Sequence, residues 1–346
     1  MKLVLPLLLL FAAAAPPPPV TRIRLPQLAH AERARYLMGT VCTGIAESRA
    51  DSAAAGAALD AAFDEIARLE DVCSSWQPAS ELQRLNAAAA DQRFECSPDH
   101  YAVIDSAFDA AEQTNGAFDP TVEPLERAWD MRGSGRVPGD SALAEARSRV
   151  SWRAVARVPA SRMVRFTHAG MGLDLGGIGK GYALDRAEEV LRARGISRAL
   201  LDFGGQLLAF SNREPWRVAV ADPGDRLQAA VRLAISNAAV STSSQSERGI
   251  EVNGARYGHI LDPRTGRPLR TDASATVVAA SGTRADALST ALLVMGRERA
   301  LEFARAHPEL GVLWLEPGTE GVRAWSSNLP TAAAAPGVAV QWMSRP

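Results

Sequence analysis

The sequence has very little lysine, little cysteine and almost no excess charge. Its 346 residues include 38 lysines and arginines against 39 aspartates and glutamates, so the formal net charge is −1. This balance gives no support to a nucleic-acid-binding protein or to one held on an anionic membrane surface. The only lysines are Lys2 and Lys180. A coding bias towards arginine explains their scarcity, but it does not explain the position of Lys180.

Cysteine is too scarce to organise the fold. Cys42, Cys73 and Cys96 are too few and too odd in number for a disulfide scaffold, and the sequence does not choose a pair among them. Stability must therefore come from a hydrophobic core. With 47% apolar residues, a mature chain of about 320 residues can bury a large core, as one domain or as two lobes.

No apolar run is long enough to span a membrane. Residues 3–15 are almost wholly apolar and lie between Lys2 and four prolines at 16–19, whereas a membrane span needs about 20 residues. A basic start, a leucine-rich core and an alanine-rich exit are typical of a secretory signal. We expect a signal peptide over residues 1–20 and an exported, periplasmic protein. An uncleaved anchor, which would keep the chain at the inner membrane, remains the alternative.

The most informative stretch is DLGGIGKGYALD, residues 174–185, which contains Lys180. Glycines allow a tight turn whose N–H groups can cradle an anion, and a helix N-terminus behind such a turn favours anions further. A helical pattern follows at once, and Gly195 can end it. The spacing fits neither a Walker loop, which needs glycine at 174, nor the dinucleotide fingerprint, which needs glycine at 182. A tight turn without a ligand is the alternative.

Elsewhere, helical and strand patterns are interspersed without regular alternation, which predicts a mixed α/β fold of the α+β class. Apolar periodicity predicts helices over residues 54–72, 101–114 and 297–306, and another that begins at an N-capping Thr283. Alternation predicts strands over 199–203, 206–210, 216–221, 230–235, 239–244, 275–281 and 311–315. Residues 131–150 are polar and glycine-rich, which predicts a surface excursion.

Several residues have side chains suited to chemistry. Asp286 and Thr290 are four apart on the predicted helix, so they share a face and offer the hard oxygen ligands that Mg²⁺ takes. Asp286 can equally be a first-turn acid that favours the helix dipole. His259 has a catalytic and a structural interpretation. Asp119 and Asp174 can be turn formers, and Trp76 can be an ordinary core residue.

Taken together, the motifs resemble the FAD:protein FMN transferases, the ApbE family, from about residue 36 to residue 316. The resemblance is carried by nine segments in order: Met38-Gly39-Thr40, WQPASELQRLN from Trp76, GAFDPTVEPL from Gly116, DLGGIGKGYALD from Asp174, Gly204-Gly205, PWRVAVADP from Pro215, Val240-Ser241-Thr242-Ser243, YGHILDPRTGRPL from Tyr257 and ADALSTALLVMG from Ala285. We expect the family domain over residues 28–330 and a separate tail over 331–346.

The resemblance implies a bilobal α+β fold with FAD in a central cleft. It places these residues at the flavin site: Met38, Trp76, Ala117, Phe118, Asp119, Asp174, Lys180 and Ile260. It implies a Mg²⁺ site made by Gly177, through its carbonyl, with Asp286 and Thr290; Ser289 falls where some members add a ligand. It gives His259 the role of general base, for which an unperturbed pKa near 6.5 is suitable.

The implied reaction is Mg²⁺-dependent transfer of FMN from FAD to a serine or threonine hydroxyl of an acceptor protein, with release of AMP. The acceptors that the family implies carry a Ser/Thr-Gly-Ala-Ser/Thr segment and include subunits of sodium-pumping quinone reductases and RNF-type complexes. Two alternatives remain: hydrolysis of FAD to FMN and AMP, and flavin binding by a non-catalytic accessory protein. The second would need a degraded metal site, yet Asp286 and Thr290 are both present.

Overall fold

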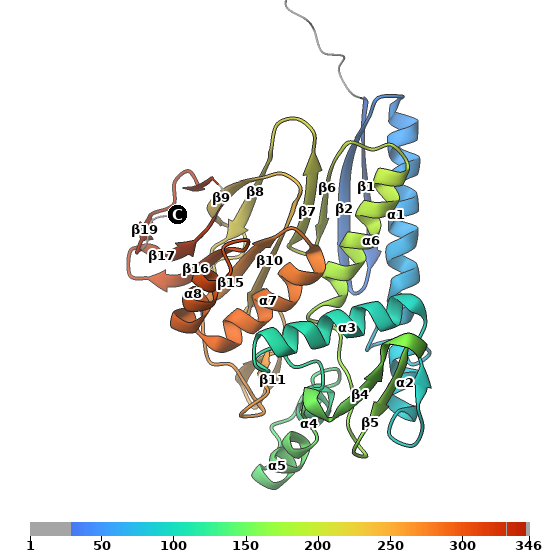
Figure 1. The fold of residues 1–346 in the computed structure, drawn as a ribbon. Coiled ribbons are helices and arrows are strands. Elements are labelled where there is room, and N and C mark those ends of the chain that lie inside the picture. Colours follow the sequence, from blue (N-terminus) through green and yellow to red (C-terminus); the bar gives the residue numbers. More distant parts are fainter. Residues whose placement is uncertain (1–28, 330, 344–346) are drawn as a thin grey trace, which may run out of the picture.

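A sheet of nine strands runs through the molecule and carries helices on one face (Figure 1). The computed structural model describes residues 29–329 and 331–343, so the expected signal peptide lies outside the described residues. The spatial order is β1-β2-β6-β7-β10-β15-β16-β17-β19, and neighbours are antiparallel except for β17 and β19. Its strands are β1 (Ala29–Leu37), β2 (Thr40–Ser48), β6 (Arg198–Phe203), β7 (Gln206–Ser211), β10 (Ala238–Ser244), β15 (Ser274–Ala279), β16 (Gly311–Gly318), β17 (Gly321–Ser327) and β19 (Val340–Trp342).

Five helices lie over one face and one end of this sheet (Figure 1). They are α1 (Ser52–Cys73), α3 (Pro98–Gln113), α6 (Gly179–Ala193), α7 (Gly282–Met295) and α8 (Arg297–Ala306). The helix expected over residues 54–72 is confirmed as α1, and the apolar face formed by Leu59, Phe63, Ile66 and Leu69 is at most 1% exposed. The main core therefore forms between these helices and the sheet.

A second, smaller core covers the opposite face of the sheet. The strands β8 (Trp216–Ala221), β9 (Ala229–Ile235) and β18 (Ala332–Ala334) form a three-stranded sheet there. Their apolar side chains pack against those of β7, β16 and β17. Residues 331–343 join this architecture, because β18 pairs with β9 and β19 pairs with β17. The expected tail thus adds one strand to each of the two sheets.

Below the main sheet in Figure 1 lies a smaller lobe built from short elements. It contains α2 (Glu81–Ala88), β3 (Phe94–Glu95), α4 (Glu123–Trp129), α5 (Asp140–Ser148), β4 (Val155–Val158), β5 (Met163–Phe166), and the short 3₁₀ turns Trp152–Ala154 and Pro159–Ser161. The surface excursion expected over residues 131–150 contains a helix, α5, in its second half. Leu143 and Ala146 of α5 are buried, and Leu143 joins a cluster with Leu125 and Trp129, so packing fixes a helix in this polar segment.

Two hairpins lie beside the cavity described below. They pair β11 (Gly249–Val252) with β12 (Ala255–Gly258), and β13 (Leu261–Asp262) with β14 (Arg267–Pro268). In the part of the chain that the structure describes, no helix has the length and apolar character needed to cross a bilayer.

The predicted N-cap of α7 is corrected by the structure. Ser281, not Thr283, caps the helix, because its hydroxyl accepts a hydrogen bond from the Arg284 N–H. The Thr283 hydroxyl donates instead to Asp185 of α6. Ser281 and Thr283 both carry a hydroxyl that can cap a helix, so the sequence alone does not distinguish them. The packing of α6 against α7 decides which residue is the N-cap.

Candidate functional site

A cavity of about 790 Å³ is enclosed by segments that are far apart in the sequence. Its volume lies within the range of about 300–1,000 Å³ that is usual for small-molecule sites. Except for Ser289, the lining brings together the residues that the sequence assigned to flavin, metal or catalysis: Met38, Trp76, Ala117, Phe118, Asp119, Asp174, Gly177, Lys180, His259, Ile260, Asp286 and Thr290. The structure therefore gathers the predicted residues into one place, while their individual roles remain predictions.

The glycine-rich turn points the N-terminus of α6 towards this cavity. The helix begins at Gly179, and no side chain caps it at Ile178. Gly176, Gly177, Gly179 and Lys180 all line the cavity. The partial positive charge of a helix N-terminus, next to a lysine, attracts an anion. This geometry favours the anion-binding interpretation over a turn without a ligand.

The backbones of α6 and α7 touch where the two helices begin. A Cβ atom on Gly181 would lie 2.1 Å from the Gly282 carbonyl oxygen, and one on Gly282 would lie 2.6 Å from the Gly181 carbonyl oxygen. Only glycine fits at either position. This approach lets the Gly181 N–H donate to Oδ2 of Asp286 at 3.0 Å.

Asp185 fixes the same junction from the next turn of α6. Its carboxylate accepts from the Ser281 hydroxyl at 2.8 Å, from the N–H groups of Gly282 and Thr283 at 2.5 and 2.9 Å, and from the Thr283 hydroxyl at 2.5 Å. These bonds satisfy N-terminal donors of α7. The start of α7, which carries Asp286, is thereby held against α6.

The residues expected at the metal site fit a hard cation. Asp286 is 4% exposed, and among the described residues no arginine or lysine forms an ion pair with it. Burial raises the pKa of its carboxyl, and the nearby charge of Lys180 opposes that shift. The Thr290 hydroxyl lies beside Gly177, only 3.4 Å from where a Cβ atom would stand on that glycine. A buried carboxylate with a hydroxyl and a carbonyl at hand is a set of oxygen donors that suits Mg²⁺.

One wall of the cavity is apolar and aromatic. Ala117, Phe118 and Ile260 are 5–7% exposed, whereas Trp76 is 61% exposed although it lines the cavity. Trp76 is therefore no ordinary core residue, and its free ring face can stack on a planar ligand. Met38 adopts a left-handed conformation with φ of 44°, and its N–H donates to Glu70 at 2.9 Å.

Asp119 and Asp174 prove to be turn formers that also line the cavity. Asp119 accepts from the N–H and hydroxyl of Thr121 and from the Trp152 N–H. Asp174 accepts from the Gly176 N–H at 2.7 Å, and its other oxygen accepts from Arg132 at 2.7 Å. The turn-former interpretation is confirmed, and turn formation positions both carboxylates at the cavity, where their contact with flavin stays a prediction.

Sequence reasoning missed five charged residues that line the cavity, namely Glu70, Glu126, Arg132, Glu247 and Arg248. Arg132 forms ion pairs with Glu126 and Asp174 at once. Arg132 belongs to residues 131–150, which the sequence predicts to be a surface excursion, so no local pattern indicated that Arg132 lines the cavity. Burial raises the pKa of Glu247, and the charges of Lys180 and Arg226 oppose that rise.

His259 is half-buried at the end of β12, and its Nδ1 lies 3.2 Å from the carbonyl oxygen of Arg248. A carbonyl can only accept, so Nδ1 carries the proton and Nε2 keeps its lone pair. Burial lowers the pKa of His259 to about 4, the bond to Arg248 opposes this shift, and the charge of Lys180 adds to it. This pKa lies below the unperturbed value near 6.5, and the ring is neutral at pH 7.

Ser289, the less certain metal ligand, is occupied elsewhere. Its hydroxyl contacts those of Ser241 at 3.1 Å and Ser243 at 2.8 Å, and donates to the Asp286 carbonyl at 2.9 Å. It is fully buried and is not part of the cavity lining. The structure thus gives it a place in a network of hydroxyls behind the site.

Comparisons with known proteins point to one family. The ApbE family model matches residues 38–314. A protein of Treponema pallidum named FAD:protein FMN transferase is 34% identical over 305 residues, which cover 82% of this chain and 84% of that protein. The structure of the Thermotoga maritima ApbE protein superposes with a TM-score of 0.76 at 30% identity, covering 82% of this chain and 94% of that one.

The apo form of the Pseudomonas stutzeri flavinyl transferase ApbE superposes with a TM-score of 0.77 at 26% identity, covering 88% of this chain and 96% of that one. The expected α+β class is confirmed by these structural neighbours, and the family model spans most of the described residues. The chain therefore belongs to the ApbE family.

Proposed function

We propose that this protein is a transferase that moves FMN from FAD to a serine or threonine hydroxyl of an acceptor protein and releases AMP. The observation that carries this proposal is the single cavity that combines an uncapped helix N-terminus, Lys180, the buried carboxylate of Asp286 and a neutral His259. The names of similar proteins, FAD:protein FMN transferase and flavinyl transferase, support the same reaction.

The pyrophosphate of FAD would lie against the start of α6. There Lys180 and the positive end of the helix dipole balance its negative charge. The Gly177 carbonyl, Asp286 and Thr290 would hold Mg²⁺, which when bound supplies further neutralisation of charge on the phosphates. The isoalloxazine ring would stack on Trp76, whose exposed face borders the same cavity.

In the transfer step, His259 would take the proton of the acceptor hydroxyl at Nε2. The hydroxyl oxygen then forms a bond to the phosphorus of the FMN half, and the bond from that phosphorus to the bridging oxygen breaks, so AMP leaves. Because His259 is already neutral at pH 7, it is ready to accept a proton. A base of low pKa is a weaker proton acceptor, so correct placement of the hydroxyl must contribute much of the rate.

The assay that tests this function mixes the protein with FAD, Mg²⁺ and a domain carrying a Ser/Thr-Gly-Ala-Ser/Thr segment, of the kind expected in quinone reductase or RNF-type subunits. Flavin fluorescence that remains on the acceptor after denaturing electrophoresis is the expected result. Rapid AMP release without an acceptor would identify a hydrolase instead. Bound FAD without any AMP would identify an accessory flavin-binding protein.

We also propose that the protein acts after export, on acceptors in the periplasm. The support is the sequence of residues 1–20, with its basic start, apolar core and proline-rich end. N-terminal sequencing of the exported protein should find a mature chain that begins between about residues 15 and 21, downstream of the apolar core. A mature chain that still begins at Met1 would contradict cleavage.

A further inference from the structure

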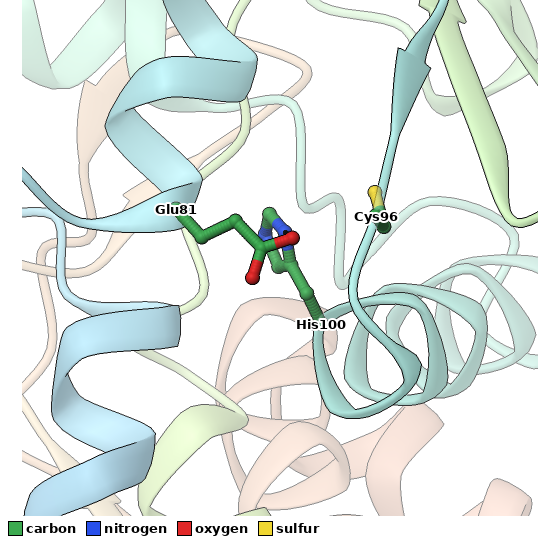
Figure 2. Close-up of side chains that lie close together, drawn as sticks. All are labelled: Glu81, Cys96 and His100. Carbon is green, nitrogen blue, oxygen red and sulfur yellow. Dashed lines mark ion pairs between the residues drawn. The ribbon is translucent and has the colours of Figure 1, made fainter.

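Three potential metal ligands meet in the smaller lobe, outside the cavity. Glu81 is the first residue of α2, Cys96 follows β3, and His100 lies in the first turn of α3 (Figure 2). Their ligand atoms all lie within 4.8 Å of one another, and the residues are 8%, 2% and 0% exposed. None of them lines the large cavity. The group is therefore separate from the site of flavin chemistry.

The imidazole of His100 is short of partners. Both ring nitrogens are buried, and neither has a partner in hydrogen-bonding geometry, although Nδ1 lies 3.2 Å from Oε1 of Glu81. Leaving a buried polar group without a hydrogen-bond partner destabilises the folded protein. Two ligands bound to one tetrahedral Zn²⁺ at about 2.0–2.1 Å stand about 3.3 Å apart. The spacing between Nδ1 and Oε1 matches that of two ligands sharing a metal.

Two hydrogen bonds from Ser97 orient the carboxylate of Glu81. The Ser97 N–H donates to Oε1 at 2.6 Å, and the Ser97 hydroxyl donates to Oε2 at 2.7 Å. Each carboxylate oxygen has two lone pairs, so these bonds leave acceptor capacity on both oxygens. Hydrogen bonds of this kind commonly orient carboxylates that ligate metals. The two bonds from Ser97 hold the Glu81 carboxylate, which lies beside the His100 ring in Figure 2.

We propose that Glu81, Cys96 and His100 bind one Zn²⁺ ion that ties the start of α2 to the start of α3. Thiolate, imidazole and carboxylate together suit zinc, whereas Mg²⁺ prefers oxygen ligands alone. The Cys96 thiol releases its proton to solvent as the sulfur–zinc bond forms, and a water molecule fills the fourth position. The zinc is structural, and it is a different ion from the Mg²⁺ expected at Asp286.

Cobalt provides the direct test, because a thiolate bound to Co²⁺ gives a near-ultraviolet charge-transfer absorption that oxygen ligands do not give. The full-length protein is treated with a chelator, freed of it and titrated with Co²⁺. We expect this absorption to saturate at one Co²⁺ per chain and to disappear when Zn²⁺ is added. We also expect the protein as purified to contain zinc.

Serine variants of the three cysteines show which thiolate gives the charge-transfer absorption. Cys96→Ser should abolish it, whereas Cys42→Ser and Cys73→Ser should keep it. His100→Gln keeps the thiol and should weaken Co²⁺ binding by more than about 10-fold. Circular dichroism of each variant shows that it is folded. If the wild-type protein shows no such absorption at saturating Co²⁺, the proposal is overturned and Glu81 and His100 form a metal-free pair. The proposal is also overturned if the absorption persists in folded Cys96→Ser.

Discussion

The N–H of Gly181 donates to the carboxylate of Asp286 at 3.0 Å, across a separation of 105 residues. Gly181 directly follows Lys180, so this bond joins the turn that faces the cavity to the predicted metal ligand. The contact exists because neither Gly181 nor Gly282 has a side chain where α6 and α7 meet. The proposed phosphate site and the proposed metal site thus share one junction of two helices.

Gly181→Ala should disrupt this junction. The new Cβ atom would stand 2.1 Å from a backbone oxygen that cannot move away alone, so α6 and α7 must separate. Overpacking of this kind costs about 1–3 kcal/mol of stability, and we expect transfer activity to fall further than stability does. Thermal unfolding and the flavin-transfer assay measure the two effects. Gly139→Ala is the matched control, because nothing lies within 4 Å of its Cβ position; equal behaviour of the two variants would contradict the role of the junction.

Asp286→Asn should separate metal use from flavin binding. The substitution keeps the shape of the side chain but removes the only carboxylate of the predicted metal set, so Mg²⁺ should bind weakly. We expect FAD to bind, as seen by fluorescence quenching, while transfer collapses and is partly rescued by excess Mg²⁺. Treating the wild-type protein with a chelator should reproduce this state, and the exposed Asp91→Asn should behave as wild type. Full activity of Asp286→Asn in chelator would rule out the metal assignment.

His259→Ala should slow FMN transfer by about 10²–10⁴-fold, the usual contribution of a general base. Because the apolar wall and the anion site remain, FAD affinity should change little. The exposed His168→Ala is a suitable control. Parallel loss of FAD binding and of transfer would identify His259 as a binding residue instead.

The pH profile of transfer tests the environment of His259 independently. Only the neutral ring accepts a proton, so activity should be retained as the pH falls through 6.5 and should be lost as it falls through about 4. The profile of kcat/KM in the free enzyme is the measurement, with circular dichroism to exclude acid unfolding. A midpoint near 6.5 would show that solvent or Mg²⁺ restores an ordinary pKa.

Arg132→Met should weaken the binding of FAD. Arg132 forms ion pairs with both Glu126 and Asp174. Without Arg132, the negative charge of these two carboxylates is not balanced and repels the phosphates of FAD. We expect KM for FAD to rise about 10-fold, which corresponds to about 1.4 kcal/mol, with a smaller change in kcat. Arg165→Ala, on the exposed side of β5, provides the control. An unchanged KM would mean that the ion pairs serve the fold alone.

The sequence predicts well where one segment carries its own signal. The stripe from Leu59 to Leu69 predicts α1, and the paired glycines between β6 and β7 predict their turn, because periodicity and turn chemistry are local. Likewise, the resemblance to the family groups residues such as Lys180 and Asp286 that the structure places in one cavity. Each of these inferences needs only the segment itself or a known motif.

What the sequence does not predict depends on long-range packing. Arg132 becomes part of the cavity only because α4 and the glycine-rich turn meet, and nothing near Arg132 signals its pairing with Asp174. The low pKa of His259 comes from burial and from Lys180, which lies 79 positions away (259 − 180). Similarly, the meeting of Glu81 with His100 depends on how α2 lies against α3. Such relations require the folded chain.

The backbone contact between Gly181 and Gly282 has a thermodynamic consequence. Because the two helix starts cannot shift independently, a ligand that orders one of them orders the other. Any increase that Mg²⁺ causes in the affinity for FAD must then be matched by an equal increase that FAD causes in the affinity for Mg²⁺. The two ligands are therefore expected to bind cooperatively, so that each is held most firmly when the other is present and both weaken together once the flavin nucleotide has been split.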